Sequence, residues 1–231
     1  MLATAVYDGG RNSPVVPRTA VGSLDRQFTL PIDLSGVSVT VNGAAAGLKQ
    51  VSSREVTFVV PPGLSSSAEG VVYPLVINNN GTIVKGNITV VQARPDIFTD
   101  TPISNPTFST SGIRTRVFNV TNTVFTREPF TITTLKYRGS RRVPTVLRLF
   151  LTGVDNVQAG SITIRIGNTR ILGTPVLTGG VLREPGIYSV DFVLPAELRG
   201  AGDQPVVVTV TIAGVTYSSR LDDTTSFIYI L

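Results

Sequence analysis

The sequence predicts an all-β fold that is built as two antiparallel β-sandwiches in tandem. The first observation is internal similarity: residues 56–76 (VTFVVPPGLSSSAEGVVYPLV) align without a gap with residues 190–210 (VDFVLPAELRGAGDQPVVVTV) and share seven identities. The second is the alternation of apolar and polar residues over many short runs, which is typical of strands with one face on a core. The third is composition, because charged residues make up only 15% of the chain and helix-forming windows are sparse.

The first sandwich is expected over residues 28–98, after an extended segment at residues 1–27 that Pro14 and Pro17 keep out of a central strand. Strands are expected at 28–34 (FTLPIDL), 37–41 (VSVTV), 55–60 (EVTFVV), 71–77 (VVYPLVI) and 87–91 (NITVV). The stretches between them are rich in Gly, Asn and Ser, as turns are. Residues 93–102 (ARPDIFTDTP) are interpreted as the linker to the second sandwich.

The second sandwich is expected over residues 99–231, with hairpins before its main strands. Strands are expected at 145–151 (TVLRLFL), 161–167 (SITIRIG), 169–177 (TRILGTPVL), 186–194 (GIYSVDFVL), 204–214 (QPVVVTVTIAG), 215–221 (VTYSSRL) and 226–231 (SFIYIL). VSVTV in the first half corresponds to ITIRI (162–166) in the second. Short strands at this spacing, with no helical period between them, are typical of immunoglobulin-like sandwiches.

Composition argues against catalysis. The chain has no Cys, His or Trp, so the commonest general base and the thiol nucleophile are absent. No phosphate-binding glycine loop, nucleophile elbow or set of metal ligands occurs, so we expect no enzyme, cofactor or metal site. A calcium site that uses Asp155, Asn156 or Asp222 is conceivable but has no loop signature. Asp191, which lies between Val190 and Phe192, is interpreted as a solvent-facing strand residue.

The net charge of +5 is dispersed except in one cluster. This cluster, KYRGSRR, contains Lys136, Tyr137, Arg138, Arg141 and Arg142 around a two-residue hairpin loop at Gly139-Ser140. Two interpretations stay open: a solvated hairpin tip, or a contact for an anion or acidic glycan. A nucleic-acid surface is not expected, because only Tyr137 is available for stacking.

Two further patterns are candidate surface features. Asn80, Asn87 and Asn119 each begin an N-x-Thr glycosylation triplet, which matters only if the chain is exported. Asn80-Gly81 is also a strong hairpin-turn signal. Five tyrosines (Tyr7, Tyr73, Tyr137, Tyr188 and Tyr217) are candidates for stacking on sugar rings.

The run SFIYIL is apolar on both faces and predicts an assembly strand. Phe227 and Tyr229 point to one side of such a strand, and Ile228 and Ile230 to the other. A strand of this kind is an aggregation hazard unless it is central in its own sheet or covered by another chain. Residues 1–27 are the candidate for that second role, because an extended segment can complete a neighbour's sheet; pairing within their own chain is the alternative.

Several phrases in the same order resemble a known family, the Solibacter-type C-terminal domain of large secreted acidobacterial proteins. They are VTVNGAAAGLKQVSSREVTFVVPPGL, ARPDIFTD, RVFNVTNTV, VLRLFLTGVDN and the long stretch from SITIRIGNTR to VTIAGVTYSS, and together they span about residues 28–220. The resemblance departs at residues 103–112, 125–143 and the final SFIYIL. It implies immunoglobulin-like repeats of the transcription-factor or plexin type, export, and a binding or structural role without catalytic residues.

The expected function is therefore that of a non-enzymatic extracellular structural or adhesive protein, with self-association into a surface filament by β-strand addition. The alternative is a carbohydrate- or protein-binding accessory module of a larger secreted protein. Expected partners are other copies of the chain, or a surface glycan or protein, and not nucleic acid. No apolar run of 18 residues is present, so no transmembrane segment is expected, and no export signal is recognised in the sequence.

Overall fold

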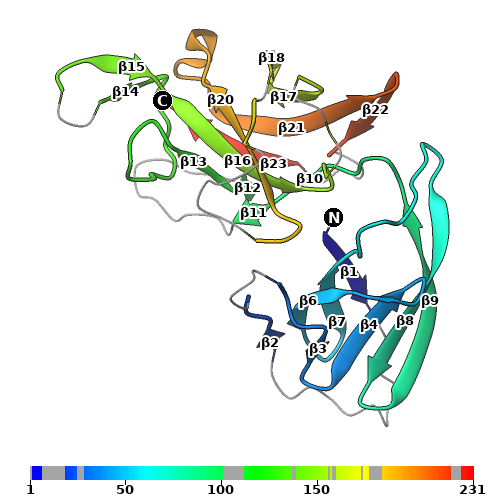
Figure 1. Cartoon of the computed structure of the whole chain (residues 1–231). Helices are drawn as coiled ribbons and strands as arrows, with labels where there is room; N and C mark the ends of the chain where they lie inside the picture. Colours follow the sequence, from blue (N-terminus) through cyan, green and yellow to red (C-terminus); the bar gives the residue numbers. More distant parts are fainter. Residues whose placement is uncertain are drawn as a thin grey trace. The chain divides into compact units, whose positions relative to one another are not determined.

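The computed structural model describes residues 2–6, 19–24, 29–100, 112–136, 139–155, 157, 160–172, 174–176, 184–219 and 225–231. Two compact units make up the chain: unit 1 is Met1–Gln92 with Val181–Ile187, and unit 2 is Ala93–Gly180 with Tyr188–Leu231 (Figure 1). Within the described residues the regular secondary structure is strand, apart from one 3-10 turn at Ala196–Leu198. The all-β prediction is confirmed, and no helix in the described part is long and apolar enough to cross a membrane.

Unit 1 contains two sheets. The first has the order β1-β7-β6-β2, and the second has the order β3-β4-β8-β9 with β5 paired to β4. The strands are β1 (Leu2–Val6), β2 (Ala20–Val21), β3 (Asp33–Leu34), β4 (Val37–Val41), β5 (Ala44–Ala45), β6 (Gly47–Val51), β7 (Glu55–Val59), β8 (Val71–Asn79) and β9 (Thr82–Val90). Their pairings are antiparallel, and β8 and β9 form one long hairpin (Figure 1).

One core lies between these two sheets. The alternation of β4 places Val37, Val39 and Val41 inward with no solvent exposure, and Phe58 of β7 meets them from the other sheet. Burial of side chains of this size stabilises a fold by roughly 1.5–3 kcal/mol each. The turn between β8 and β9 uses Asn80 and Gly81, both at positive φ, as its sequence predicts.

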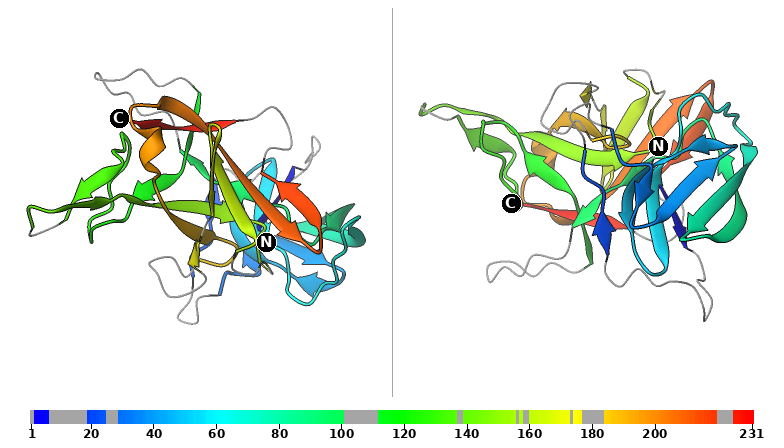
Figure 2. Two further views of the ribbon diagram at one scale, coloured as in Figure 1. Left: turned by 90° about the horizontal axis from the view of Figure 1, so that it is seen from above. Right: turned by 60° about the horizontal axis from the view of Figure 1, so that its bottom comes forward.

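Unit 2 contains two main sheets and a separate hairpin. One sheet has the order β10-β16-β20-β19 with β13 paired to β16, and the other has the order β11-β12-β23-β21-β17-β18 with β22 paired to β21. The strands are β10 (Asp96–Ile97), β11 (Thr99–Asp100), β12 (Ile113–Thr115), β13 (Val117–Asn119), β16 (Val146–Thr152), β17 (Ile162–Ile166), β18 (Thr169–Leu172), β19 (Thr174–Val176), β20 (Tyr188–Val193), β21 (Gly202–Ile212), β22 (Val215–Ser218) and β23 (Ser226–Ile230). The hairpin of β14 (Thr133–Leu135) and β15 (Arg142–Pro144) projects from the rest of unit 2 in both views of Figure 2.

The core of unit 2 is also shared by two sheets. Leu147, Leu149 and Leu151 of β16 are fully buried and face the alternating Ile and Val residues of β17 and β21. Among the described residues, the two cores share no member.

The two units pair their strands in the same order. In unit 1, β5, β4, β8 and β9 are successive neighbours in one sheet, and β1, β7 and β6 in the other. In unit 2, β18, β17, β21 and β22 repeat the first order, and β16, β20 and β19 repeat the second. The segments 37–41 and 162–166, which the sequence relates, therefore occupy equivalent strands, β4 and β17.

The register shows where the gapless sequence alignment fails. The connection from β7 to β8 covers residues 60–70, which is three residues longer than the connection 194–201 from β20 to β21. Leu75 lies opposite Val41 of β4, whereas Val206 lies opposite Ile166 of β17. Leu75 and Val206 are therefore equivalent, and the sequence pairing of Val72 with Val206 is wrong by three residues.

Two expected boundaries also differ from the structure. The described strands of the expected N-terminal segment belong to unit 1, because β1 pairs along its whole length with β7 and β2 pairs with β6, as the alternative of pairing within the chain predicts. By its place beside β7, β1 corresponds to β16 of unit 2. The expected linker at 93–102 is part of unit 2 as far as it is described: Ala93 lies in that core, and β10 pairs with β16.

Candidate functional site

One candidate site in unit 1 is a groove between the edges of its two sheets. Its walls are β1 on one side and β8 and β9 on the other, and it encloses about 310 Å³. Its lining residues are Ala3, Thr4, Ala5, Val6, Phe58, Leu75, Ile77, Val84, Lys85, Gly86, Asn87 and Ile88. Lys85 is the only charged member of this set, so the groove is mainly apolar with backbone edges along both rims.

Both rims are strands at the end of their sheets. Among the described strands, β9 pairs only with β8, and β1 pairs only with β7. Nine consecutive residues of β9 pair with β8 without a bulge. An edge this long and regular offers a row of backbone donors and acceptors, which natural proteins normally cover or interrupt. The groove therefore combines hydrogen-bonding edges with an apolar floor.

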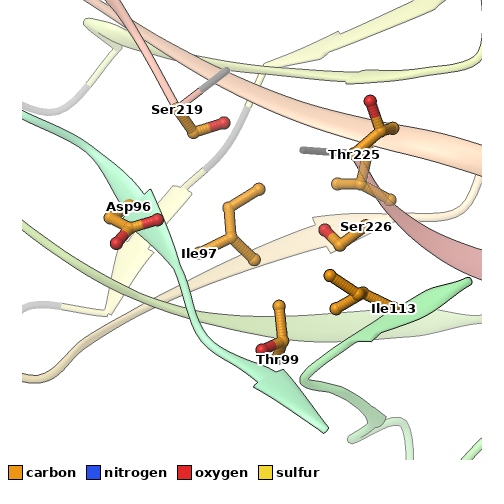
Figure 3. Close-up of a pocket in the computed structure, with 8 residues that line it drawn as sticks. Asp96, Ile97, Thr99, Ile113, Ser219, Thr225 and Ser226 are labelled. Carbon is orange, nitrogen blue, oxygen red and sulfur yellow. The ribbon is translucent and has the colours of Figure 1, made fainter. Parts of the chain in front are cut away.

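A much smaller pocket lies in unit 2. It encloses about 60 Å³ and is lined by Asp96, Ile97, Thr99, Ile113, Val206, Ser219, Thr225 and Ser226. Figure 3 shows Ile97 among these side chains, with Asp96 on one side of it and Ser226 and Ile113 on the other. Ligand pockets usually hold about 300–1,000 Å³, so this space suits a few water molecules rather than a substrate.

Asp96 supplies the only carboxyl group in that pocket. Partial desolvation raises the pKa of Asp96, while the N–H of Ile97 and the charge of Arg94 oppose the rise. Its side chain still reaches solvent. Hydroxyl groups are its only polar companions in the lining, so the pocket offers no second acid or base for proton transfer.

Sequence reasoning missed a buried charge network in unit 2. Arg114 is 1% exposed and donates through Nε and Nη2 to both oxygens of Glu128 (2.7 and 2.6 Å) and through Nη1 to Asp203 (2.8 Å). Glu128 also accepts the N–H of Tyr229 at 2.8 Å. Desolvation alone would lower the pKa of Arg114, but the hydrogen bonds to Glu128 and Asp203 and the charges of both carboxylates together raise it. Because these contacts join residues of β12, β21 and β23, we interpret the network as a structural tie between the three strands.

The outer face of β16 carries a second polar cluster. Arg148 and Asp191 face each other across β16 and β20 and form a bidentate ion pair (2.7 and 2.8 Å). Asp191 thus lies on the outer face, as expected, but has a partner there. Nearby, the guanidinium groups of Arg148 and Arg127 lie over the rings of Phe125 and Phe118 at 5.8 and 5.2 Å. One face of each of these two rings is thus covered by a guanidinium group.

The basic hairpin is only partly described. Lys136, Arg141 and Arg142 are exposed near its tip, whereas Tyr137 and Arg138 lie outside the described residues. The hairpin itself is as expected, but its ladder ends at the pair Leu135 and Arg142, so the loop is longer than Gly139-Ser140. The N–H of Lys136 donates to the carbonyl of Arg141, which closes the base of this longer loop. Whether the tip binds an anion stays a prediction.

The three glycosylation triplets have different surroundings. Asn87 is exposed on β9 at the rim of the groove, and Asn80 is exposed in the β8–β9 turn. Asn119 is already used: its nitrogen donates to Thr134 Oγ1 at 2.9 Å and its oxygen accepts the N–H of Thr121. A glycan on Asn119 would replace one of the two hydrogens of the nitrogen that donates to Thr134, so this position is more constrained than the other two.

The expected assembly strand is an interior strand of unit 2. Residues Phe227 to Ile230 lie in β23, which pairs with β21 on one side and with β12 on the other. Beyond β12, the N–H of Phe130 donates to the carbonyl of Tyr229. Both edges of β23 are therefore filled, and the assembly role given to Phe227, Ile228, Tyr229 and Ile230 is wrong. The sequence shows that this strand needs cover but not which segment supplies it.

The remaining expected sites give little further chemistry. Within the described residues no group of three or more metal-ligating side chains occurs, and Asn156 and Asp222 of the conceivable calcium site lie outside them. Asp155 accepts the hydroxyl of Tyr188, and this bond together with desolvation raises the pKa of that hydroxyl. Tyr73 donates to the carbonyl of Ser65, so these two tyrosines serve structural hydrogen bonds.

No protein-family model matches this chain, and a search of curated proteins finds no significant match. The resemblance to the Solibacter-type domain therefore stays a prediction.

Proposed function

We propose that this chain is a non-enzymatic structural or adhesive protein that holds a partner protein through the groove side of unit 1. The observation that carries the proposal is the combination of the nine-residue edge of β9 with the apolar groove beside it. Val6 and Val72, 75% and 61% exposed, add apolar surface from β1 and β8. Apolar surface along an uncovered strand edge is costly in water and typical of interaction sites.

The same groove gives little support to an enzyme. Its lining contains one ammonium group, on Lys85, and one amide, on Asn87, and no carboxylate that would serve as a base. The only other cavity described above is too small for a substrate. A binding role needs none of these missing groups.

The family resemblance and the all-β architecture support two further parts of the proposal. The first is that the units are copies of one immunoglobulin-like sandwich, since the order of strand pairing is the same in each. The second is that the protein acts outside the cell. The earlier proposal of a self-assembled filament loses its two candidate strands, because β1 and β23 pair within their own units.

Site-specific photo-crosslinking tests the proposed function. A benzophenone side chain is placed at Ile83 on β9, and a matched one at Val215 on β22 of unit 2; both positions are exposed. In cells that make the native protein, we expect a discrete protein adduct from position 83, in the surface fraction, and none from position 215. Equal adducts at both positions, or an adduct only in the cytosolic fraction, would contradict the proposal.

A further inference from the structure

Unit 2 shows what the groove of unit 1 lacks. The open side of unit 2, between β16 and β23, is closed by residues 113–119 of the same chain. The first part of this segment, β12, adds to β23 in parallel, and the second part, β13, adds to β16 in antiparallel. Thr115 and Val117 of this segment are each 5% exposed, and Val117 belongs to the core. Residues 113–119 thus bridge the two sheets, and this segment is termed the wedge.

The same two edges are present in unit 1. Ala3 lies opposite Phe58 as Leu147 lies opposite Phe192, so β1 holds the place of β16. Gly86 lies opposite Leu75 as Ser226 lies opposite Val206, so the second half of β9 holds the place of β23. No described strand joins these edges, and the groove of about 310 Å³ lies between them.

The floor of the groove differs from unit 2 in two side chains. Ala3 and Ala5 stand where unit 2 has Leu147 and Leu149, both fully buried. Two leucines in β16 fill the space that two alanines in β1 leave open. Native cores are closely packed, so a gap of this size calls for side chains from elsewhere.

The solvent exposure of residues on the rims of the groove also indicates that a segment equivalent to residues 113–119 is missing from the described part of unit 1. Val6 is 75% exposed, whereas Phe150 at the equivalent place is 6% exposed, because Phe118 of the wedge packs edge-on against it at 5.8 Å. Val72 is 61% exposed, whereas Asp203 at the equivalent place binds Arg114 of the wedge. Val6 and Val72 are therefore exposed at places where the equivalent residues of unit 2 contact the wedge.

We propose that unit 1 takes an extended segment of a partner protein, which inserts between β1 and β9 as residues 113–119 insert in unit 2. The inference rests on the proposed function and names its mode. The segment runs parallel to β9 and antiparallel to β1. It pairs first with Gly86 and Asn87, and then with Ala5, Thr4 and Ala3.

The lining also specifies side chains on the partner. The residues at the places of Thr115 and Val117 are large and apolar, because Ala5 and Ala3 leave room below them. The residue at the place of Arg114 is uncharged, because Val72 replaces the carboxylate of Asp203. Backbone pairing along both rims supplies affinity, and these alternate side chains supply register. An acyl chain fits the apolar floor but leaves both backbone edges unpaired, so a peptide fits better.

A peptide probe tests the insertion on the full-length chain. The probe is a fluorescent synthetic peptide of residues 112–120 carrying Arg114→Val and Thr115→Leu, which removes the buried charge of the wedge and places a large apolar side chain at the place of Thr115. We expect saturable binding by anisotropy. In the variant Ala3→Leu/Ala5→Leu, which fills the groove, binding weakens by at least about tenfold, because the apolar pocket for the alternate side chains is lost. The matched control Ala44→Leu/Ala45→Leu makes the same change at two exposed positions on β5 and binds like the parent.

Hydrogen exchange assigns the bound peptide to a unit. Insertion into the groove slows amide hydrogen exchange in residues 82–90 and leaves that of residues 226–230 unchanged. If the peptide instead replaces the chain's own wedge, amide hydrogen exchange slows in residues 226–230 and is unchanged in residues 82–90. Circular dichroism and melting confirm that both double variants fold. Protection at 226–230 alone, or equal binding by the two double variants, overturns the proposal.

Two other occupants have their own signatures, and each would overturn the inference. Dimerisation of the chain alone in sedimentation, abolished by Ala3→Leu/Ala5→Leu, would make a second copy the occupant. A fluorescent fatty acid that binds with that same variant dependence, while the peptide does not bind, would make it a lipid site. If the peptide fails but the adduct from position 83 persists, the proposed function stands and only the insertion mode is wrong.

Discussion

At the scale of single residues, Arg114 is the least expected feature of the molecule. It stands in the strand-like run GIRTR, where alternation gives no sign that a guanidinium will be buried. Its partners Glu128 and Asp203 are 14 and 89 residues away, so no local pattern connects them. Burial becomes tolerable only because three carboxylate contacts satisfy the guanidinium, and only the fold brings them together.

We expect Arg114→Met to destabilise unit 2 strongly. The change leaves Glu128, whose side chain is 6% exposed, without its charge partner, and such losses typically cost about 3–5 kcal/mol. Guanidinium denaturation measures the loss. The double variant Arg114→Met/Glu128→Gln should lose less than the sum of the single changes. Additive losses would show that the pair is not coupled.

A matched exposed pair serves as the control for that experiment. Lys49 and Glu184 of unit 1 form an ion pair at 3.0 Å with side chains 27% and 41% exposed. Because water screens such a pair, Lys49→Met should change the free energy of unfolding by no more than about 1 kcal/mol.

Gly153 carries a second prediction at this scale. Its φ is +75°, and an added Cβ would lie 1.8 Å from the carbonyl oxygen of Arg94. We expect Gly153→Ala to cost more than Gly214→Ala, where φ is +84° but no atom lies within 4 Å of the new Cβ. Gly214→Ala should cost only the left-handed backbone, about 1–2 kcal/mol. Equal melting temperatures for the two variants would refute the clash.

At the scale of strands, period-2 alternation is a reliable guide in this chain. It places β4, β7, β17 and the buried faces of β21 where the structure has them, because each strand has one face on a core. It does not identify the neighbour of a strand. Of the two roles left open for residues 1–27 and for SFIYIL, pairing within the chain is the one that β1, β2 and β23 show. Alternation could not decide between those roles, because it does not specify which strand is the neighbour.

The comparison of β1 with β16 leads to a prediction about unit 2. Leu149→Ala makes β16 resemble β1 at the position of Ala5, and should cost about 2–5 kcal/mol by leaving a cavity beneath the wedge. Leu172→Ala on β18, at a side chain that is 67% exposed, should change the free energy of unfolding little. Chemical denaturation compares them, and equal effects would mean that the wedge repacks freely over the gap.

At the scale of the whole molecule, the sequence predicts two sandwiches but misplaces their limits. Residues 184–187 follow the strands of unit 2 along the chain yet belong to unit 1, where Glu184 meets Lys49. Composition changes little across either boundary, so nothing in the sequence signals that the chain returns to unit 1 at these residues. The groove was also beyond sequence reasoning, because it depends on what Ala3 and Ala5 fail to fill.

The separate cores predict two thermal transitions. Phe58 and Phe192 hold equivalent places, one in each core, and both are nearly fully buried. Phe58→Ala should lower one calorimetric transition and Phe192→Ala the other, each by the roughly 3–5 kcal/mol typical of a lost core aromatic. A single transition that both variants shift equally would show that the units unfold together.

The closing segment of unit 2 has a consequence for biosynthesis. Residues 113–115 are made well before Ser226 and Phe227, with which they pair. At about 5–20 residues per second, the ribosome needs roughly 6–23 s to add the intervening residues. Through that interval β12 has no β23 to pair with, whereas β13 can pair with β16 once residue 152 has been made. We expect a molecular chaperone to be most needed in that interval, and ribosome-bound chains stalled between residues 120 and 220 to show it.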